Sequence, residues 1–253
     1  MCVILHVTEA FGGGVFASVT QTCNGLAELG FNVHLAYSER PETPQQIREH
    51  LDPRVTLHRL QMTRSMNPIR DLRSLVDVVR LLRRLRPDVV HLHSSKAGFL
   101  GRLAAFPLGI RERVFYSPRG LAFLRQDTSP LMRRWFRVFE RVGATFGGTL
   151  VACSASELEQ VQARIRPRRA TMVENAVDTA AVRPRQARAD ATCRIGTLGR
   201  IGPQKDPAAF ASLAEELAGP GVSFTWIGGG DAEASGTLKR AGVTVTERSL
   251  IAC

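Results

Sequence analysis

The chain has 253 residues, of which 44% are hydrophobic and 23% are charged. This composition is normal for a globular protein, and it excludes a disordered tail protein, a collagen-like fibre and a coiled coil. The chain carries 34 basic and 23 acidic residues, which gives a net charge of +11. A positive field favours anionic partners such as nucleotides, phosphates, nucleic acid or an acidic membrane surface. Because only three of the basic residues are lysines, the arginine surplus also fits a GC-rich coding sequence.

Short apolar runs rich in β-branched residues alternate with helical periods along the chain. In chain order, the first part predicts a strand at 2–7, a glycine turn at 12–14, a helix at 15–29, strands at 31–37 and 54–60, a helix at 69–85, a strand at 88–93, a helix at 96–106, a strand at 113–116, a helix at 131–146, a strand at 149–153, a helix at 155–164 and a short strand near 171–174. Residues 179–192 lack long apolar runs and predict a linker. The pattern then restarts, with strands predicted at 193–198, 222–227 and 242–246 and helices at 207–218 and 232–240.

Strands that alternate with helices imply parallel βαβ units with right-handed crossovers. The predicted fold class is therefore α/β, with one complete Rossmann-like parallel-sheet domain over residues 1–178 and a linker over residues 179–192. Residues 193–253 predict a partial second Rossmann-like domain, because three strands and two helices are too few to cover both faces of a parallel sheet.

The cysteines and the N-terminus indicate a compartment. Five scattered cysteines without a C-x-x-C spacing form neither a disulfide framework nor a zinc site, so we expect a reducing cytosol. The N-terminal apolar run lacks a basic region and a cleavage site, and therefore predicts a strand rather than a signal peptide. No run of 18 apolar residues predicts a membrane span. The expected location is cytoplasmic, with peripheral attachment to the inner face of the membrane as a further option.

Ligands of open parallel sheets bind at the carboxyl ends of the strands, so the loops there carry the candidate residues. Gly12, Gly13 and Gly14 follow the first predicted strand and open a helix, whose free N–H groups can bind an anion. A tight turn that needs positive φ explains the same glycines equally well. Lys96 follows the fourth strand, where it can contact a phosphate or a sugar hydroxyl. A solvated lysine in the first helical turn is the alternative.

Two histidines and an arginine lie in neighbouring segments. His91 and His93 alternate along the fourth strand, and we expect one of them to face the interior of the sheet as a core histidine. No carboxylate cluster accompanies them, so the sequence predicts no metal site. Arg119 follows the fifth strand in a Ser-Pro-Arg-Gly turn, and its guanidinium fork suits a phosphate or a carboxylate. The alternative is an ordinary surface arginine.

The segment Gly199–Asp206 gives the strongest local signal. It lies between an apolar strand and a helix, and Arg200 and Lys205 flank its Gly-Pro loop. Two cations and the loop amides can converge there on one anion. The segment is not a P-loop, because two residues interrupt the Gly-Lys-Ser/Thr order. An ordinary turn with scattered charges is the alternative. At the next strand end, Gly228–Gly230 let the backbone approach a flat or charged ligand in the same way.

The order of these segments carries a family resemblance: the glycine loop at 12–14, His-Ser-Ser-Lys-Ala-Gly at 93–98, Ser-Pro-Arg-Gly at 117–120, Ala-Cys-Ser-Ala-Ser-Glu at 152–157, Val-Glu-Asn-Ala-Val-Asp at 173–178, Gly-Arg-Ile-Gly-Pro-Gln-Lys-Asp at 199–206 and Trp-Ile-Gly-Gly-Gly-Asp at 226–231. Over its whole length the chain resembles family-4 glycosyltransferases of the GT-B fold, especially bacterial capsule and exopolysaccharide enzymes. The resemblance implies a GT-B-like fold and transfer of a sugar from a nucleotide-sugar donor to a glycan or lipid-linked acceptor, with retention of configuration. It also implies that neither a metal nor another cofactor is needed.

The resemblance also assigns roles to individual residues, with the donor lying between two domains. Arg200 and Lys205 would hold the donor diphosphate and stabilise the leaving group as the catalytic cations. Gly13 and Gly14 would approach the diphosphate or the acceptor. The other implied roles are those of Asn175 in shaping the cleft, of Gly229 and Gly230 in making room near the nucleotide, and of Lys96 and Arg119 as sugar or acceptor contacts.

The chain departs from the family pattern at two places. Arg119 stands in the turn where many relatives have a histidine, so the role of that histidine does not carry over. The family's C-terminal Glu-x7-Glu motif is absent, because the chain ends at Cys253 before any partner for Glu247 is reached. We therefore expect a truncated or frame-shifted product and leave its activity open. The alternative is a non-catalytic remnant or binding module that associates with a membrane or a partner transferase.

The predicted helix at 131–146 is basic and amphipathic, with arginines set against aromatic side chains. Such a helix can rest on an anionic membrane, but we favour its packing on the sheet with the arginines in water. Nucleic-acid binding rests on net charge alone, because no helix-turn-helix, RRM or zinc signature accompanies it. The expected partners are thus a nucleotide sugar and a glycan or lipid-linked acceptor, with peripheral contact to an anionic membrane as an option and no nucleic acid.

Overall fold

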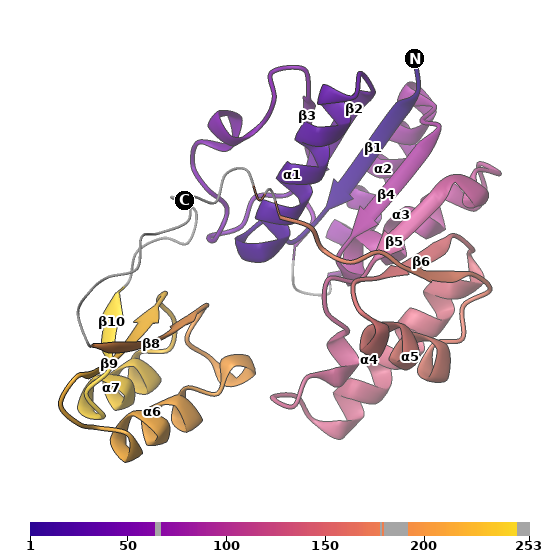
Figure 1. Cartoon of the computed structure of the whole chain (residues 1–253). Coiled ribbons are helices and arrows are strands. Elements are labelled where there is room, and N and C mark those ends of the chain that lie inside the picture. The colour runs from indigo at the N-terminus through magenta and orange to yellow at the C-terminus, as the bar shows by residue number, and fades with distance from the viewer. Residues whose placement is uncertain (64–66, 178, 180–191, 247–253) are drawn as a thin grey trace. The chain divides into compact units, whose positions relative to one another are not determined.

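The computed structural model describes residues 1–63, 67–177, 179 and 192–246. The chain forms two compact units, Met1–Val177 and Asp178–Cys253 (Figure 1). Most of the predicted linker, residues 180–191, and Glu247 lie outside the described residues.

The first unit is built on a seven-stranded sheet in the order β3-β2-β1-β4-β5-β6-β7, and every neighbouring pair is parallel. The strands are β1 (Val3–Thr8), β2 (Asn32–Tyr37), β3 (Thr56–Arg59), β4 (Val89–His93), β5 (Val114–Ser117), β6 (Thr149–Ala152) and β7 (Ala170–Met172). The strand order reverses between β1 and β4. In doubly wound sheets, ligands bind outside the carboxyl ends of the strands at such a reversal.

The described helices that connect these strands are α1 (Gly13–Glu28), α2 (Pro68–Leu85), α3 (Ser95–Ala105), α4 (Pro130–Thr145) and α5 (Ala155–Arg164). Local residues fix the starts of three of them. The side chains of Asn67, Ser129 and Ser154 each accept a hydrogen bond from the backbone N–H three residues later. Such caps satisfy donors that the first helical turn leaves unpaired. Pro68 and Pro130 follow two of the caps, where a proline's missing N–H is not needed.

Alternation along the strands gives the sheet two different faces. Leu5, Val7 and Leu92 belong to the core that also contains apolar residues of α2 and α3, which lie behind the strands in Figure 1. The histidines point to the other side, because His6 pairs with His91 and Thr8 pairs with His93. The expectation that only one of the two β4 histidines faces inward is therefore corrected. Residues two apart in a strand project from the same face.

A buried polar cluster joins α3, α4 and β5. Arg102 and Glu140 are only 3% and 2% exposed, and Arg102 Nη2 lies 3.3 Å from Glu140 Oε2. The Tyr116 hydroxyl donates to Glu140 Oε1 at 2.8 Å, and the guanidinium carbon of Arg102 lies 4.3 Å from the centre of the Tyr116 ring. Gly143 makes room for the guanidinium, since a Cβ at that position would lie 2.5 Å from Arg102 Nη2. The ion pair is thus enclosed by protein.

The second unit has a parallel sheet of three strands in the order β10-β9-β8, with two described α-helices. Its elements are β8 (Cys193–Leu198), α6 (Pro207–Glu216), β9 (Val222–Ile227), α7 (Ala232–Arg240) and β10 (Thr244–Thr246). Trp226 is fully buried in its core beside Phe224 and Leu238, and its indole N–H donates to the carbonyl of Gly199 at 2.9 Å. Asp206 and Asp231 cap the two helices.

The predicted α/β class is confirmed, and each predicted strand and helix occurs within two residues of its expected bounds. The prediction missed the short 3-10 helices Ile47–His50, Arg111–Arg113, Ala122–Leu124 and Pro203–Lys205. These are single turns, which are too short to show an apolar period. None of the described helices combines the length and the apolar character that a bilayer span requires.

Candidate functional site

Loops at the carboxyl edge of the first sheet surround an open groove of about 990 Å³. Its lining includes Gly14 of α1, Arg119 after β5, Cys153 after β6 and Asn175 after β7. A smaller hollow of about 460 Å³ shares Arg119 and Asn175 and extends to His91. The groove therefore lies where the strand order predicts a ligand site.

Arg119 makes the central polar contacts of this groove. Its Nη1 donates to Ser18 Oγ and to Asn175 Oδ1, at 2.8 Å each. Its Nε and Nη2 each lie 3.3 Å from His93 Nδ1. The backbone of Arg119 has φ +57°, in the left-handed region that bulky residues rarely adopt. Strain of this kind persists where surrounding contacts fix the conformation, as these three partners do here.

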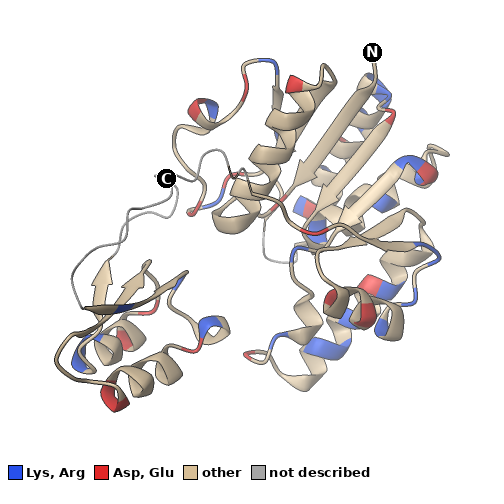
Figure 2. Ribbon diagram, viewed as in Figure 1, with Lys and Arg blue, Asp and Glu red and all other residues tan. Residues whose placement is uncertain are grey.

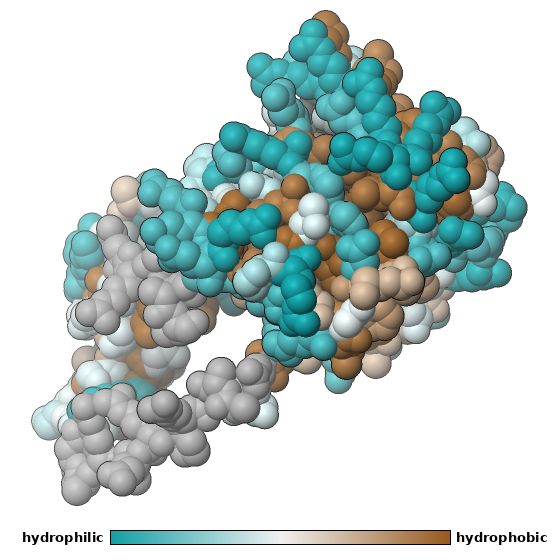
Figure 3. Space-filling view, turned by 90° about the horizontal axis from the view of Figure 1, so that it is seen from above, coloured by the Kyte–Doolittle hydropathy of each residue, from teal (hydrophilic) through white to brown (hydrophobic). Residues whose placement is uncertain are grey.

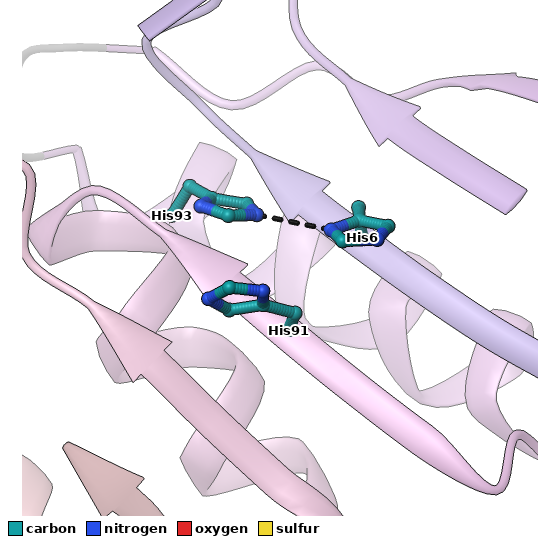
Figure 4. Close-up of side chains that lie close together, drawn as sticks. All are labelled: His6, His91 and His93. Carbon is teal, nitrogen blue, oxygen red and sulfur yellow. Dashed lines mark hydrogen bonds between the residues drawn. The ribbon is translucent and has the colours of Figure 1, made fainter. Parts of the chain in front are cut away.

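Three neutral histidines lie next to Arg119. His6 Nδ1 is 3.1 Å from His93 Nε2, and the ring centroids of His91 and His93 are 4.1 Å apart (Figure 4). Burial, and then the charge of Arg119, lowers the pKa of His6 to about 4. Burial first, and then the neighbouring histidines and Arg119, lowers the pKa values of His91 and His93 well below 6.5. All three imidazoles are therefore uncharged at neutral pH.

The spacing of these imidazoles also raises the question of a metal, because one ring nitrogen from each lies within 4.8 Å of the others. The hydrogen bonds argue against it. A guanidinium only donates, so His93 Nδ1 must accept, and His93 Nε2 then carries a proton instead of a lone pair for a metal. The charge of Arg119 also repels a second cation at this distance. We therefore assign no metal to the histidine cluster.

The groove brings together some of the predicted site residues of the first unit. Gly14 lines it, and Asn175 contacts Arg119 directly. Gly13 opens α1 with φ +52° and has open space where a Cβ would stand. Lys96 is not among the residues that line the groove, and its Nζ lies 2.8 Å from Asp71 Oδ1, which ties α3 to α2. The position of Lys96 therefore gives its predicted role in ligand binding no support.

Sequence reasoning missed two residues of this site, Ser18 and His6. Ser18 lies one helical turn after Gly14, so a glycine loop followed by a hydroxyl at this spacing is a usable signal. His6 becomes visible once β1 is placed beside β4, because it then pairs with His91.

In the second unit, two glycine loops run side by side. Ile201 N donates to the carbonyl of Gly229 at 3.0 Å. A Cβ on Gly228 would lie 2.3 Å from the carbonyl oxygen of Gly199, and a Cβ on Gly230 would lie 2.2 Å from that of Ile201. Close backbone approach thus requires glycine at both positions. The loop pairing gives these glycines a structural role, beside their predicted role near a nucleotide.

Arg200 and Lys205 are both exposed on the first of these loops. The stem of Lys205 covers Gly199, where a Cβ would lie 2.9 Å from Lys205 Cε. Neither cation forms an ion pair within the part of the chain that the structure describes. The two predicted catalytic cations are therefore on one short loop and accessible to an anion.

The chain has relatives among known proteins. The chain is 29% identical over 171 residues to UDP-Gal:alpha-D-GlcNAc-diphosphoundecaprenol alpha-1,3-galactosyltransferase of Escherichia coli, a match that covers 62% of this chain and 43% of that protein. It is 31% identical over 179 residues to an uncharacterized 41.2 kDa protein in the cps region of Klebsiella pneumoniae, covering 69% of this chain and 46% of that protein. The chain spans less than half the length of these two relatives.

Solved structures share the fold. The sucrose-phosphate synthase of Thermosynechococcus elongatus matches with a TM-score of 0.72 at 14% identity, over 98% of this chain and 71% of that one. Anabaena Alr3699/HepE in complex with UDP-glucose matches with a TM-score of 0.73 at 14% identity, over 98% of this chain and 69% of that one. These likenesses confirm the predicted GT-B-like fold class. The profile of the family described as "Glycosyl transferase 4-like domain" matches residues 13–176, more than half of the chain. The chain therefore belongs to the glycosyl transferase 4-like family.

Proposed function

We propose that the protein is a glycosyltransferase that moves a sugar from a nucleotide-sugar donor to a glycan or lipid-linked acceptor, with retention of anomeric configuration. Membership of the glycosyl transferase 4-like family supports this, as does the name of the Escherichia coli relative, which gives UDP-Gal as donor and a diphosphoundecaprenol-linked sugar as acceptor. The observation that carries the proposal is the loop of the second unit on which Arg200 and Lys205 stand exposed beside paired glycine backbones.

These two cations supply the charge that the reaction needs. When the bond between the sugar and the diphosphate breaks, negative charge develops on the departing diphosphate. Cations that are already oriented stabilise that charge without reorganisation. In this proposal Arg200 and Lys205 do so without a metal or another cofactor, and Gly229 and Gly230 let the loop backbone approach the nucleotide. Gly13, Gly14, Arg119 and Asn175 of the first unit contact the donor or the acceptor.

Replacing Arg200 and Lys205 with alanine tests the donor site. Each substitution removes a charge-assisted hydrogen bond to phosphate, and should weaken binding of a UDP- or GDP-sugar by about tenfold to a hundredfold. Isothermal titration of the full chain with each nucleotide sugar measures the affinity. Lys239→Ala is the matched control, because Lys239 is an exposed cation of the same unit on α7 and should leave the affinity unchanged. The proposal fails if the unaltered chain binds no nucleotide sugar.

Helix α4 supports a second, non-enzymatic function, contact with an anionic membrane. Leu131, Trp135, Val138 and Val142 are 67%, 63%, 41% and 42% exposed, and their spacing places them in one stripe along the helix. Arginines accompany this stripe, as the basic bands on α4 in Figure 2 show. Seen from above, the molecule has further apolar patches among hydrophilic side chains (Figure 3). What distinguishes the α4 stripe is an exposed tryptophan, Trp135, together with arginines, a combination that suits anionic lipid.

Glutamate in place of both Trp135 and Val138 should reduce binding to vesicles that contain phosphatidylglycerol by about tenfold or more, because two apolar anchors are lost and negative charge is added. Co-sedimentation measures the bound fraction. Leu29→Glu is the control, since Leu29 is 76% exposed at the end of α1 and lies outside the stripe. Equal binding by the double variant and the unaltered chain would refute this membrane contact.

A further inference from the structure

Arg119 is a partly buried cation whose hydrogen-bond acceptors are all uncharged. Its four hydrogen bonds end on a serine hydroxyl, an asparagine carbonyl and an imidazole nitrogen, those of Ser18, Asn175 and His93. No aspartate or glutamate within the described residues lies at ion-pair distance from it. Glu157 lines the same groove and its charge acts on Arg119, but it forms no ion pair with the guanidinium. The charge of Arg119 is therefore not held by a paired carboxylate and can act on a ligand in the groove.

The hydrogen bonds also fix the protonation of two histidines. Because Arg119 donates to His93 Nδ1, the proton of the neutral His93 ring is on Nε2. That N–H points to His6 Nδ1 at 3.1 Å, so the His6 proton is on its own Nε2 (Figure 4). The order of donation is therefore Arg119 to His93 to His6, through two imidazoles in the same tautomer.

Both imidazoles are rigidly placed. His93 is fully buried and His6 is 1% exposed, and both stand on neighbouring strands whose register pairs residues 6 and 91. His6 Nε2, at the end of the chain of hydrogen bonds, has no partner within the described residues. The His93 ring thus fixes the position of the guanidinium, with His6 behind it, and neither ring carries a negative charge.

We infer that His93, with His6 behind it, is a positioning residue that aims Arg119 at a diphosphate group bound in the groove. The inference rests on the proposed function, because that reaction brings a diphosphate to this site from either substrate. The nucleotide sugar carries one, and so does an acceptor linked to a prenyl carrier. Gly12 and Gly14 line the same groove at the start of α1, where free amide groups also favour an anion.

Two substitutions of His93 separate its two hydrogen bonds. Asparagine places a carbonyl oxygen near the position of Nδ1 and keeps an acceptor for Arg119. Glutamine places its amide near the position of Nε2, and keeps the contact with His6 while removing that acceptor. We expect His93→Gln and Arg119→Ala to weaken binding of inorganic diphosphate by about tenfold or more, and His93→Asn to stay within about threefold of the unaltered chain.

The experiment titrates the full chain and these variants with inorganic diphosphate, a UDP-sugar and farnesyl diphosphate by calorimetry. If Arg119→Ala and His93→Gln weaken binding of the UDP-sugar, the groove binds the donor. If these variants weaken binding of farnesyl diphosphate alone, the groove binds a lipid-linked acceptor. Long-range ¹H–¹⁵N spectra report the tautomers, and should show protons on Nε2 of both His93 and His6. A proton on His93 Nδ1 would overturn the inference.

Unchanged binding of all three ligands by Arg119→Ala and His93→Gln would also overturn the inference. The proposed function would survive that result if Arg200→Ala still weakens binding of the nucleotide sugar. A failure of the proposed donor site alone can also be recognised. If inorganic diphosphate binds in an Arg119-dependent manner while no nucleotide sugar binds, the positioning role holds and the proposed donor site fails.

Discussion

Alanine in place of Glu140 should lower the free energy of unfolding of the first unit by about 3–5 kcal/mol, the usual effect of removing one partner from a buried ion pair. Glu140 and Arg102 are 2% and 3% exposed, so the substitution leaves a guanidinium buried without its charged partner. The substitution also leaves the Tyr116 hydroxyl without its acceptor. Burial, and then the charge of Glu140, raises the pKa of Tyr116 well above 10, so that hydroxyl remains a donor. Urea unfolding followed by circular dichroism measures the loss.

Two controls isolate the buried charge. Glu112 pairs with Arg169 at the surface, where both side chains are more than half exposed, and Glu112→Ala should change stability by less than about 1 kcal/mol. Changing Arg102 to Met, Glu140 to Leu and Tyr116 to Phe together removes every polar member of the cluster, and should destabilise less than Glu140→Ala alone. Equal urea midpoints for Glu140→Ala and the unaltered chain would contradict this account of the cluster.

Local signals explain why the elements were predictable. The Asn67 and Ser129 caps, each followed by proline, mark helix starts in the sequence itself, and β-branched runs mark the strands. The doubly wound arrangement then follows from alternation of the two element types. The contact of Lys96 with Asp71 was not predictable in this way. It depends on how α2 and α3 pack, and this tertiary contact occupies a lysine whose position after a strand indicated a ligand.

The candidate site was only half visible in the sequence for the same reason. The turn that carries Arg119 was identified from its Pro and Gly, but its partners Ser18 and Asn175 lie 101 and 56 residues away along the chain. The histidine cluster likewise requires the register between β1 and β4, since His6 is 87 residues from His93. Whether an arginine faces a carboxylate or only neutral groups depends on such distant partners. Within the described residues Arg119 forms no ion pair, and the sequence alone could not show this.

Acid should destabilise the first unit through the same histidines. In the folded unit the pKa of His6 is about 4, against 6.5 ordinarily, and the pKa values of His91 and His93 are also well below 6.5. The unfolded chain therefore binds protons near pH 6.5 that the folded unit does not bind. The contribution of these neutral histidines to the free energy of unfolding is fully present above pH 6.5 and is lost as the pH falls toward 4. His6 alone accounts for about 3 kcal/mol, and His91, His93 and the partly buried His58 act in the same direction.

The second unit provides an internal control for this acid effect, because all six histidines of the chain precede residue 94. Trp135→Phe leaves Trp226, buried in the second unit, as the sole tryptophan, so its fluorescence reports that unit alone. Between pH 7.5 and 4.5, the urea midpoint from circular dichroism should then fall more than the midpoint from Trp226. His6→Gln should reduce the pH dependence of the first unit by up to about 1.4 kcal/mol per pH unit, the effect of one proton. The opposing outcome is that both midpoints shift in parallel and that His6→Gln changes neither shift. The acid response would then come from carboxylates, which each unit contains, and not from the histidine cluster.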